Sequence, residues 1–237
     1  MNTTRFAAPH CATCPSYDRS LLHTCSGAAH DQISDSKTAQ QYAGGQVIFQ
    51  EGSRALGLYC VHSGLIKISK TGGDGKEQIV RLARGGGMLG FRGLVTGTLH
   101  STTAVALDAS VVCLVRKQDF FAEMADNRAF SGELIQLLAK ALLEVEERML
   151  HLAYKPVRER LAEALLLLLR MFRAEDQLVP PAFAISRDDL GALMGTTKET
   201  TTRMLSEFKA EGMLTTKGSA ITILEPQRLM VIATRYD

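Results

Sequence analysis

Five cysteines are the residues of this chain whose side chains are best suited to chemistry. Cys11 and Cys14 form a Cys-x-x-Cys pair, and the other three follow within the N-terminal half. The total is odd, and the N-terminus lacks the cationic stretch and apolar core of a signal peptide. The pattern therefore argues against a disulfide framework and favours metal or redox chemistry in a cytoplasmic protein.

A second group of polar side chains lies in the segment 185–209. Ser186 and Asp189 form a capping box that begins a short helix, and Gly195 ends it. One of the next two threonines can cap a second helix. The side chains left on its outer face are the candidate base readers: Lys198, Glu199, Thr202 and Arg203. Because glutamate can accept from cytosine N4 and arginine can donate twice to guanine, the segment predicts a DNA-reading helix-turn-helix.

A pair of helices used only for packing would show the same glycine turn. The run Thr200–Thr202 argues against that interpretation, because β-branched residues weaken a helix but suit a face that meets phosphates and bases. Beyond it, residues 212–224 alternate like a short hairpin that turns at Lys217 and Gly218. We therefore predict a winged helix-turn-helix.

Two longer elements must hold these groups in place. From about Tyr42 to Val115, short apolar runs separated by glycines predict a small β-barrel or jelly roll. The glycine-rich run 85–90 lacks the strand-to-helix context and the lysine of a nucleotide loop, so we interpret it as a turn.

A change of period follows the predicted barrel. Apolar residues now recur at alternating steps of four and three: Leu138, Leu142, Val145, Met149 and Leu152. This spacing fits a coiled-coil seam or a helix lying on its own barrel. The helix-turn-helix favours the seam, because two recognition helices one duplex turn apart require a two-fold dimer. Lys155 and Pro156 end the predicted helix.

Composition sets the outer limits of these predictions. With 237 residues and 46% hydrophobic content the chain can form two modest domains, and a formal charge of +2 favours specific recognition over bulk coating of nucleic acid. The longest apolar run, residues 164–169, is too short to cross a membrane. No His, Asp or Ser residues stand at a spacing that suggests nucleophile and base, so we expect no enzyme.

The expected α+β organisation resembles the Crp/Fnr superfamily of transcription regulators over roughly residues 40 to 225. The expected parts are an N-terminal arm, a β-barrel, a dimerisation helix and a winged helix-turn-helix, over residues 1–40, 41–118, 119–155 and 156–237. The resemblance rests on five segments: 50–52, 58–64, 88–91, 158–161 and 198–203. It implies a cyclic-nucleotide-binding-like jelly roll, a homodimer, double-stranded DNA and RNA polymerase as partners, and no membrane.

Cyclic-nucleotide control is not expected. Family members that bind cyclic AMP hold its phosphate with Gly-Glu and Arg-Ser pairs, whereas Gly87, Met88, His100 and Ser101 stand at what look like those places. Replacing arginine by a mostly neutral histidine removes the bidentate clamp on phosphate.

The Fnr branch of the family senses oxygen with a [4Fe-4S] cluster held by three N-terminal cysteines and one in the barrel. The resemblance therefore implies four ligands here: Cys11, Cys14, Cys25 and Cys113. Thiolates are soft ligands that suit iron. Oxygen would then convert or remove the cluster, release the arm and weaken the dimer, so that DNA affinity falls.

Other interpretations of the arm stay open. Ten residues separate Cys14 from Cys25, which is more than is usual in the family, so Cys25 departs from the pattern. Cys60 is interpreted as an ordinary buried strand cysteine. His10, His23 or His30 could instead complete a zinc or haem site, and a haem could respond to nitric oxide. The arm could also carry no ligand, in which case the regulator would respond to thiol redox or to a metabolite in the barrel.

The same resemblance extends to the DNA sequence. Glu199, Thr202 and Arg203 match the reading residues of the Fnr branch, although a serine is usual at the place of Thr202. They imply a palindrome with TTGAT-like half-sites. Lys198 departs from the branch and could contact phosphate or guanine.

Overall fold

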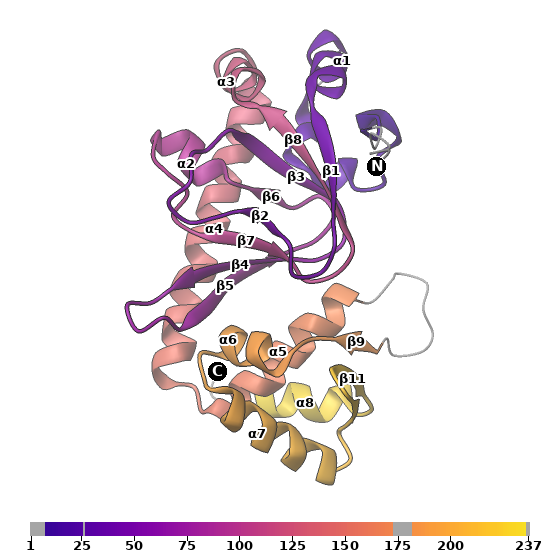
Figure 1. Ribbon diagram of the computed structural model, residues 1–237, viewed down its shortest axis with the longest axis vertical. Coiled ribbons are helices and arrows are strands. Elements are labelled where there is room, and N and C mark those ends of the chain that lie inside the picture. Colours follow the sequence, from indigo (N-terminus) through magenta and orange to yellow (C-terminus); the bar gives the residue numbers. More distant parts are fainter. Residues whose placement is uncertain (1–7, 26, 173–181, 236–237) are drawn as a thin grey trace, which may run out of the picture. The chain divides into compact units, whose positions relative to one another are not determined.

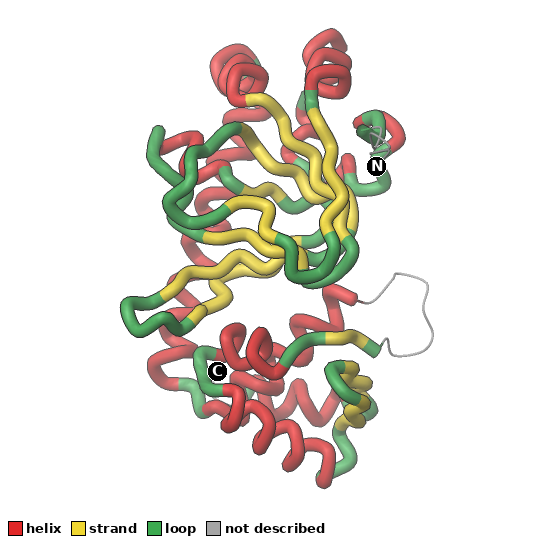
Figure 2. Tube along the Cα trace, viewed as in Figure 1, coloured by secondary structure: helices red, strands yellow, loops and turns green. Residues whose placement is uncertain are grey.

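The computed structural model describes residues 8–25, 27–172 and 182–235. The chain divides into two compact units, which contain residues 1–71 with 80–142 and residues 72–79 with 143–237. Strands dominate the first unit and helices the second (Figures 1 and 2). Within the described residues, no helix is both long and apolar enough to span a membrane.

The β-barrel consists of two four-stranded antiparallel sheets, as the glycine-punctuated apolar runs predict. Their strand orders are β1-β8-β3-β6 and β2-β7-β4-β5. The strands are β1 (Thr38–Tyr42), β2 (Val47–Phe49), β3 (Gly57–Ser63), β4 (Ile66–Thr71), β5 (Glu77–Ala83), β6 (Met88–Leu89), β7 (Thr103–Ala106) and β8 (Ser110–Arg116). The glycine-rich run 85–90 forms the turn before β6 and supplies that strand.

The N-terminal arm has more structure than the sequence predicts. Its described residues form three 3₁₀ turns and one α-helix: η1 (Cys11–Thr13), η2 (Tyr17–Arg19), η3 (Leu21–Thr24) and α1 (Gly27–Ser36). Leu21, Leu22 and Ile33 are almost fully buried in one apolar cluster with residues of β3 and β8. Burial against the barrel therefore orders a segment whose own sequence has no helical or strand periodicity.

The helical stretch after the barrel differs from the expected single helix over 119–155. A short helix α2 (Phe91–Thr96) precedes β7, and after β8 come α3 (Lys117–Asp126) and α4 (Arg128–Tyr154). Asn127 separates the last two, because its side-chain oxygen accepts a hydrogen bond from the Phe130 amide at 3.1 Å and so caps α4. Phe130 and Leu134 then anchor the start of α4 in the barrel cluster.

The second unit contains the predicted winged helix-turn-helix. It is built from α5 (Val157–Phe172), β9 (Phe183–Ala184), α6 (Arg187–Met194), α7 (Lys198–Ala210), β10 (Leu214–Lys217), β11 (Ala220–Ile223) and α8 (Pro226–Ala233). The Ser186 hydroxyl accepts from the Asp189 amide at 2.9 Å, which confirms that Ser186 caps α6. Gly195 ends α6 with a φ of +67°, and Thr197 is the threonine that caps α7.

Candidate functional site

Four of the five cysteines line one small cavity between the arm and the barrel. They are Cys11, Cys14, Cys60 and Cys113. The cavity measures about 20 Å³ and is closed by apolar and polar side chains of the arm, among them Tyr17 and Leu22. Cys25 is the predicted ligand that does not line it.

The barrel contributes two thiols to this cavity through strand pairing. Cys60 on β3 and Cys113 on β8 are Cα partners in the antiparallel ladder, so their side chains leave the sheet on the same face. Both are buried, at 7% and 5% exposure. The sequence interpretation treated Cys60 as an ordinary strand residue, and the strand period alone could not show that its face meets the arm.

Hydrogen bonds attach the arm around Cys11 and Cys14. The Cys11 amide donates to the Ser34 hydroxyl at 3.1 Å. The Cys14 sulfur lies 3.1 Å from Nδ1 of His62, and the Ser16 hydroxyl donates to the His62 carbonyl at 3.1 Å. The Cys-x-x-Cys turn is therefore tied both to α1 and to β3.

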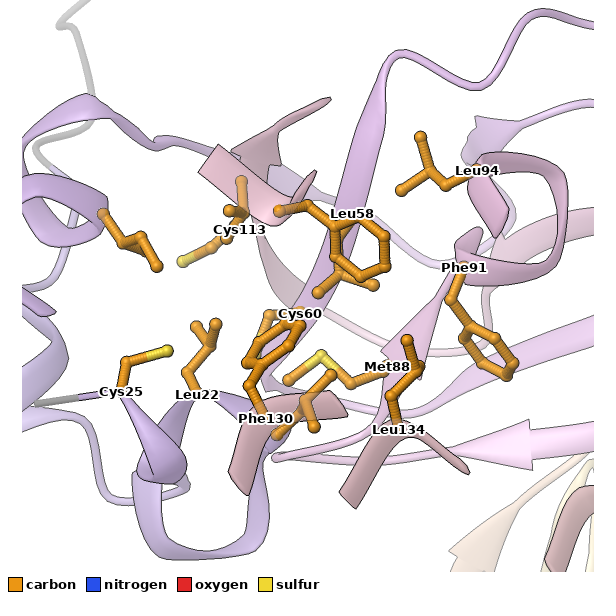
Figure 3. Packing of buried hydrophobic residues seen from close by; sticks show 14 of the residues in the cluster. Leu22, Cys25, Leu58, Cys60, Met88, Phe91, Leu94, Cys113, Phe130 and Leu134 are labelled. Carbon is orange, nitrogen blue, oxygen red and sulfur yellow. The ribbon is translucent and has the colours of Figure 1, made fainter. Parts of the chain in front are cut away.

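Cys25 belongs to the same apolar cluster as the cavity cysteines. Figure 3 shows its sulfur and that of Cys113 turned toward the same space. Burial, followed by a hydrogen bond to the Glu123 carboxylate, raises the pKa of Cys25 to about 12. Cys25 therefore lies near the other thiols, but its side chain is hydrogen-bonded to Glu123 of α3.

Burial also raises the pKa of the two barrel thiols. The pKa of Cys113 rises to about 11, while the positive charge of Lys37 opposes the shift. For Cys60 burial is again the main cause of the raised pKa, and Cys113, Cys14 and Cys11 add to it. Burial therefore favours the protonated form of both thiols, which lie close enough to influence one another.

A buried lysine completes the wall of the cavity. Lys37 lines it and is 5% exposed. Its ammonium donates to the carbonyl and hydroxyl oxygens of Ser34, at 3.0 and 3.3 Å. Among the described residues no carboxylate forms an ion pair with it, so its charge is buried beside neutral groups.

The residues fit an iron-sulfur cluster by their chemistry. Cysteines from two separate segments can supply the thiolate ligands of such a cluster. In the described part of the chain, however, no three His, Cys, Asp or Glu side chains stand ready to hold a metal ion. The thiols would therefore have to turn toward a common centre and widen the cavity.

A second cavity lies inside the barrel, where the resemblance places a nucleotide phosphate. It measures about 30 Å³ and is lined by residues that include Arg81, Leu89 and His100. The His100 ring is 3% exposed and stacks on Phe49 at a centroid distance of 4.0 Å. This volume is far below the roughly 300–1,000 Å³ of an ordinary small-molecule site, and the stacked rings of His100 and Phe49 form part of the cavity wall.

The predicted base readers all lie exposed on the first turns of α7: Lys198, Glu199, Thr202 and Arg203. Thr201, Leu205 and Phe208 are buried on the opposite face of the helix. Thr202 and Thr201 donate their hydroxyls to backbone carbonyls one turn earlier, at 2.8 Å each, which satisfies the β-branched run within the helix.

Lys198 has a partner that the sequence did not reveal. Its ammonium lies 2.8 Å from the carboxylate of Asp188 on α6. This hydrogen bond raises the pKa of Lys198. The lysine is therefore held between the two helices of the motif.

The predicted seam of α4 is apolar and largely uncovered in the single chain. Leu142, Val145 and Met149 are 59%, 39% and 66% exposed, while Leu138 and Leu152 are half-buried. Ile135, three residues before Leu138 and 66% exposed, extends the heptad pattern by one position. The extent of the seam stays a prediction.

Comparison with known proteins matches both halves of the chain to described families. Residues 39–127 match the cyclic nucleotide-binding domain and residues 159–232 match the Crp-like helix-turn-helix domain.

Relatives cover nearly the whole chain. The fumarate and nitrate reduction regulatory protein of Vibrio cholerae serotype O1 is 31% identical over 95% of this chain and 91% of its own length. The protein of that name from Escherichia coli K12 is 30% identical with the same coverage.

Solved structures share the fold. FixK2 from Bradyrhizobium japonicum superposes with a TM-score of 0.74 at 27% identity, over 85% of this chain and 99% of that one. A Crp/Fnr-family transcriptional regulator from Thermus thermophilus gives a TM-score of 0.71 at 24% identity, over 84% and 100%; at that identity it supports the fold alone.

These matches confirm the predicted architecture of jelly roll, long helix and winged helix-turn-helix. The relatives are regulators of transcription and not enzymes. The chain is therefore a DNA-binding transcription regulator of the Crp/Fnr family, similar to the fumarate and nitrate reduction regulators.

Proposed function

We propose that this regulator binds DNA in the absence of oxygen and loses affinity in its presence, through a [4Fe-4S] cluster held by Cys11, Cys14, Cys25 and Cys113. The observation that carries the proposal is the meeting of arm and barrel thiols in one buried place. Identity of about 30% to the fumarate and nitrate reduction regulators supports the same conclusion.

When bound, the cluster would supply an oxygen-labile crosslink between the arm and β8. The protein's own residues connect that place to α4. Asn127 donates one hydrogen bond to the carbonyl of Thr24, beside Cys25, at 3.0 Å and another to Glu123 at 2.9 Å. Because Asn127 also caps α4, a shift of the arm would disturb the first turn of that helix.

The proposed output is a homodimer formed through the apolar seam of α4. The exposed residues of this seam form an apolar stripe on each protomer, which a second copy of the chain would cover. Two copies of α7 would then present Glu199, Thr202 and Arg203 to a palindrome with TTGAT-like half-sites. RNA polymerase is the proposed partner at the promoter.

The test is to purify the protein without oxygen and to measure iron, sulfide, visible absorption and DNA affinity before and after exposure to air. We expect about four irons and four sulfides per subunit and a loss of DNA affinity as the absorption bleaches. Protein that contains no iron and sulfide, or only zinc, would contradict the proposed cluster. The conclusion that the chain is a DNA-binding regulator would still stand.

One observation favours a second ligand set. Cys60, and not Cys25, lines the cavity with the other three cysteines. Cys25→Ala and Cys60→Ala therefore form a matched pair of buried variants. Loss of iron in Cys25→Ala alone would support the first set, and loss in Cys60→Ala alone would support the second.

A further inference from the structure

A positive charge is buried in the thiol cavity without a negative partner among the described residues. Only 5% of the Lys37 residue surface is exposed to solvent. Both of its hydrogen-bond acceptors belong to Ser34 and are neutral oxygens. Isolated buried charges are strongly destabilising, and lysines are almost never fully buried unless paired. The position therefore requires an explanation.

The surroundings of Lys37 point to an anion in the cavity. The lysine lines the same wall as Cys11, Cys14, Cys60 and Cys113. Its charge acts on the two barrel thiols, Cys60 and Cys113. No described carboxylate forms an ion pair with it, so the groups lining the cavity that could become anionic are the thiols themselves.

We propose that Lys37 is the counter-charge of the cluster and sets its reduction potential and retention. The inference rests on the proposed function, since it needs the cluster. Four thiolates and an oxidised [4Fe-4S] core form a dianion, and reduction adds another negative charge. A fixed ammonium in a site of low polarity stabilises the more negative state, because net charge and solvent exposure set such potentials.

A purely structural role makes the opposite prediction for the protein without iron. The Lys37 ammonium also caps the carbonyl end of α1 through the Ser34 carbonyl. If this cap were its purpose, Lys37→Met would destabilise the apoprotein. If Lys37 is a counter-charge, removing it relieves a buried unpaired cation, so the apoprotein keeps or gains thermal stability and only the loaded protein loses stability.

The experiment compares wild type, Lys37→Met, Lys37→Gln and Lys37→Arg, each with and without reconstituted cluster. Lys70→Met is the matched control, because Lys70 is on the barrel but its side chain is 56% exposed. The readouts are iron content, the potential from a dye-coupled redox titration, and the melting temperatures of the apo and loaded forms.

We expect at least a tenfold lower ratio of reduced to oxidised cluster in the two neutral variants at a fixed potential, which is about 59 mV for one electron. Lys37→Arg and Lys70→Met should stay near wild type. If the neutral variants keep no cluster while their apoproteins melt as wild type does, the counter-charge role is also supported.

Unchanged potential and iron content in Lys37→Met would overturn the inference, as would apoproteins of both neutral variants that melt well below wild type. Failure of the proposed function gives a different result, because wild type itself would then contain no iron.

Discussion

At the scale of single residues, we propose that exposed side chains on α7 decide which DNA sequences this regulator distinguishes. The buried face of the helix fixes its position through Thr201, Leu205 and Phe208. The exposed face carries the residues that can meet base edges, and Arg203 is the one whose two-pronged donor suits guanine.

Replacing Arg203 by Ala should therefore cost about 1–3 kcal/mol of binding to the preferred palindrome and relax discrimination at one base pair. Quantitative binding to a set of single-base half-site variants measures both effects. Arg203→Lys is the control, because it keeps the charge but loses the planar fork; it should retain affinity for unrelated DNA. A uniform loss on every sequence would show that Arg203 contacts only phosphate.

His100 makes the stability of the barrel dependent on pH. Burial lowers its pKa below the ordinary value, and its Nε2 is buried without a hydrogen-bond partner among the described residues. The His100 imidazole binds a proton more tightly in the unfolded chain than in the folded chain. The free energy of unfolding is therefore unaffected by this group above about pH 6.5, and it decreases as the pH falls toward the lowered pKa.

Urea unfolding between about pH 7.5 and 5 should accordingly show a smaller decline for His100→Gln than for wild type. His10→Gln serves as the control, since His10 is exposed. Parallel curves for wild type and His100→Gln would mean that another group titrates.

At the scale of elements, the turn between α6 and α7 combines a left-handed backbone with close packing. Gly195 has a φ of +67°, and a Cβ there would meet the Leu152 side chain at 2.6 Å. Gly218 in the wing has a similar φ of +61° but open space around it. An alanine at Gly218 therefore tests backbone strain alone, whereas an alanine at Gly195 tests backbone strain together with crowding.

We predict that Gly218→Ala costs about 1 kcal/mol, from the left-handed backbone alone, and that Gly195→Ala costs clearly more. Differential scanning calorimetry of the two variants gives the comparison. Equal losses would show that Leu152 moves aside without cost, and a DNA affinity unchanged in Gly195→Ala would show that the turn does not set the angle of α7.

Elements with strong local signals were predictable from the sequence. The capping residues and the two glycine turns placed α6, α7 and the wing, and the glycine-separated strands indicated the barrel. The arm was not predictable as structure, because its turns owe their order to burial against β3 and β8. Cys60 is the buried strand cysteine that was predicted, but its place in the cavity wall could not be predicted, because period-two alternation gives its face and not what covers that face. Likewise, Lys37 has no sequence signal that distinguishes it from a surface lysine.

At the scale of the whole molecule, the proposed function depends on association with a second copy of the chain. The apolar residues of α4 that remain exposed would be costly in a stable monomer, since large apolar patches normally mark an interface. Association and DNA affinity should therefore change together.

Leu142→Glu should convert the protein to a monomer and lower its affinity for a palindrome by at least tenfold, while its far-ultraviolet circular dichroism stays unchanged. Gln136→Glu adds the same charge to an exposed position of α4 outside the seam and should remain dimeric. Sedimentation velocity measures the state of each. A Leu142→Glu protein that still sediments as a dimer would place the interface elsewhere.

Because the five thiols differ in burial, their rates of labelling can report how different parts of the structure open. Cys14 is half-buried, whereas Cys60 sits in the middle of β3 opposite Cys113. An alkylating reagent can reach Cys14 through local fluctuations of the arm, but it reaches Cys60 only when the arm leaves the face of the barrel that it covers. Labelling rates of the iron-free protein would thus report two separate free energies, one for local opening of the arm and one for its complete undocking. Their difference measures how far the arm can open before it loses its contacts with the barrel.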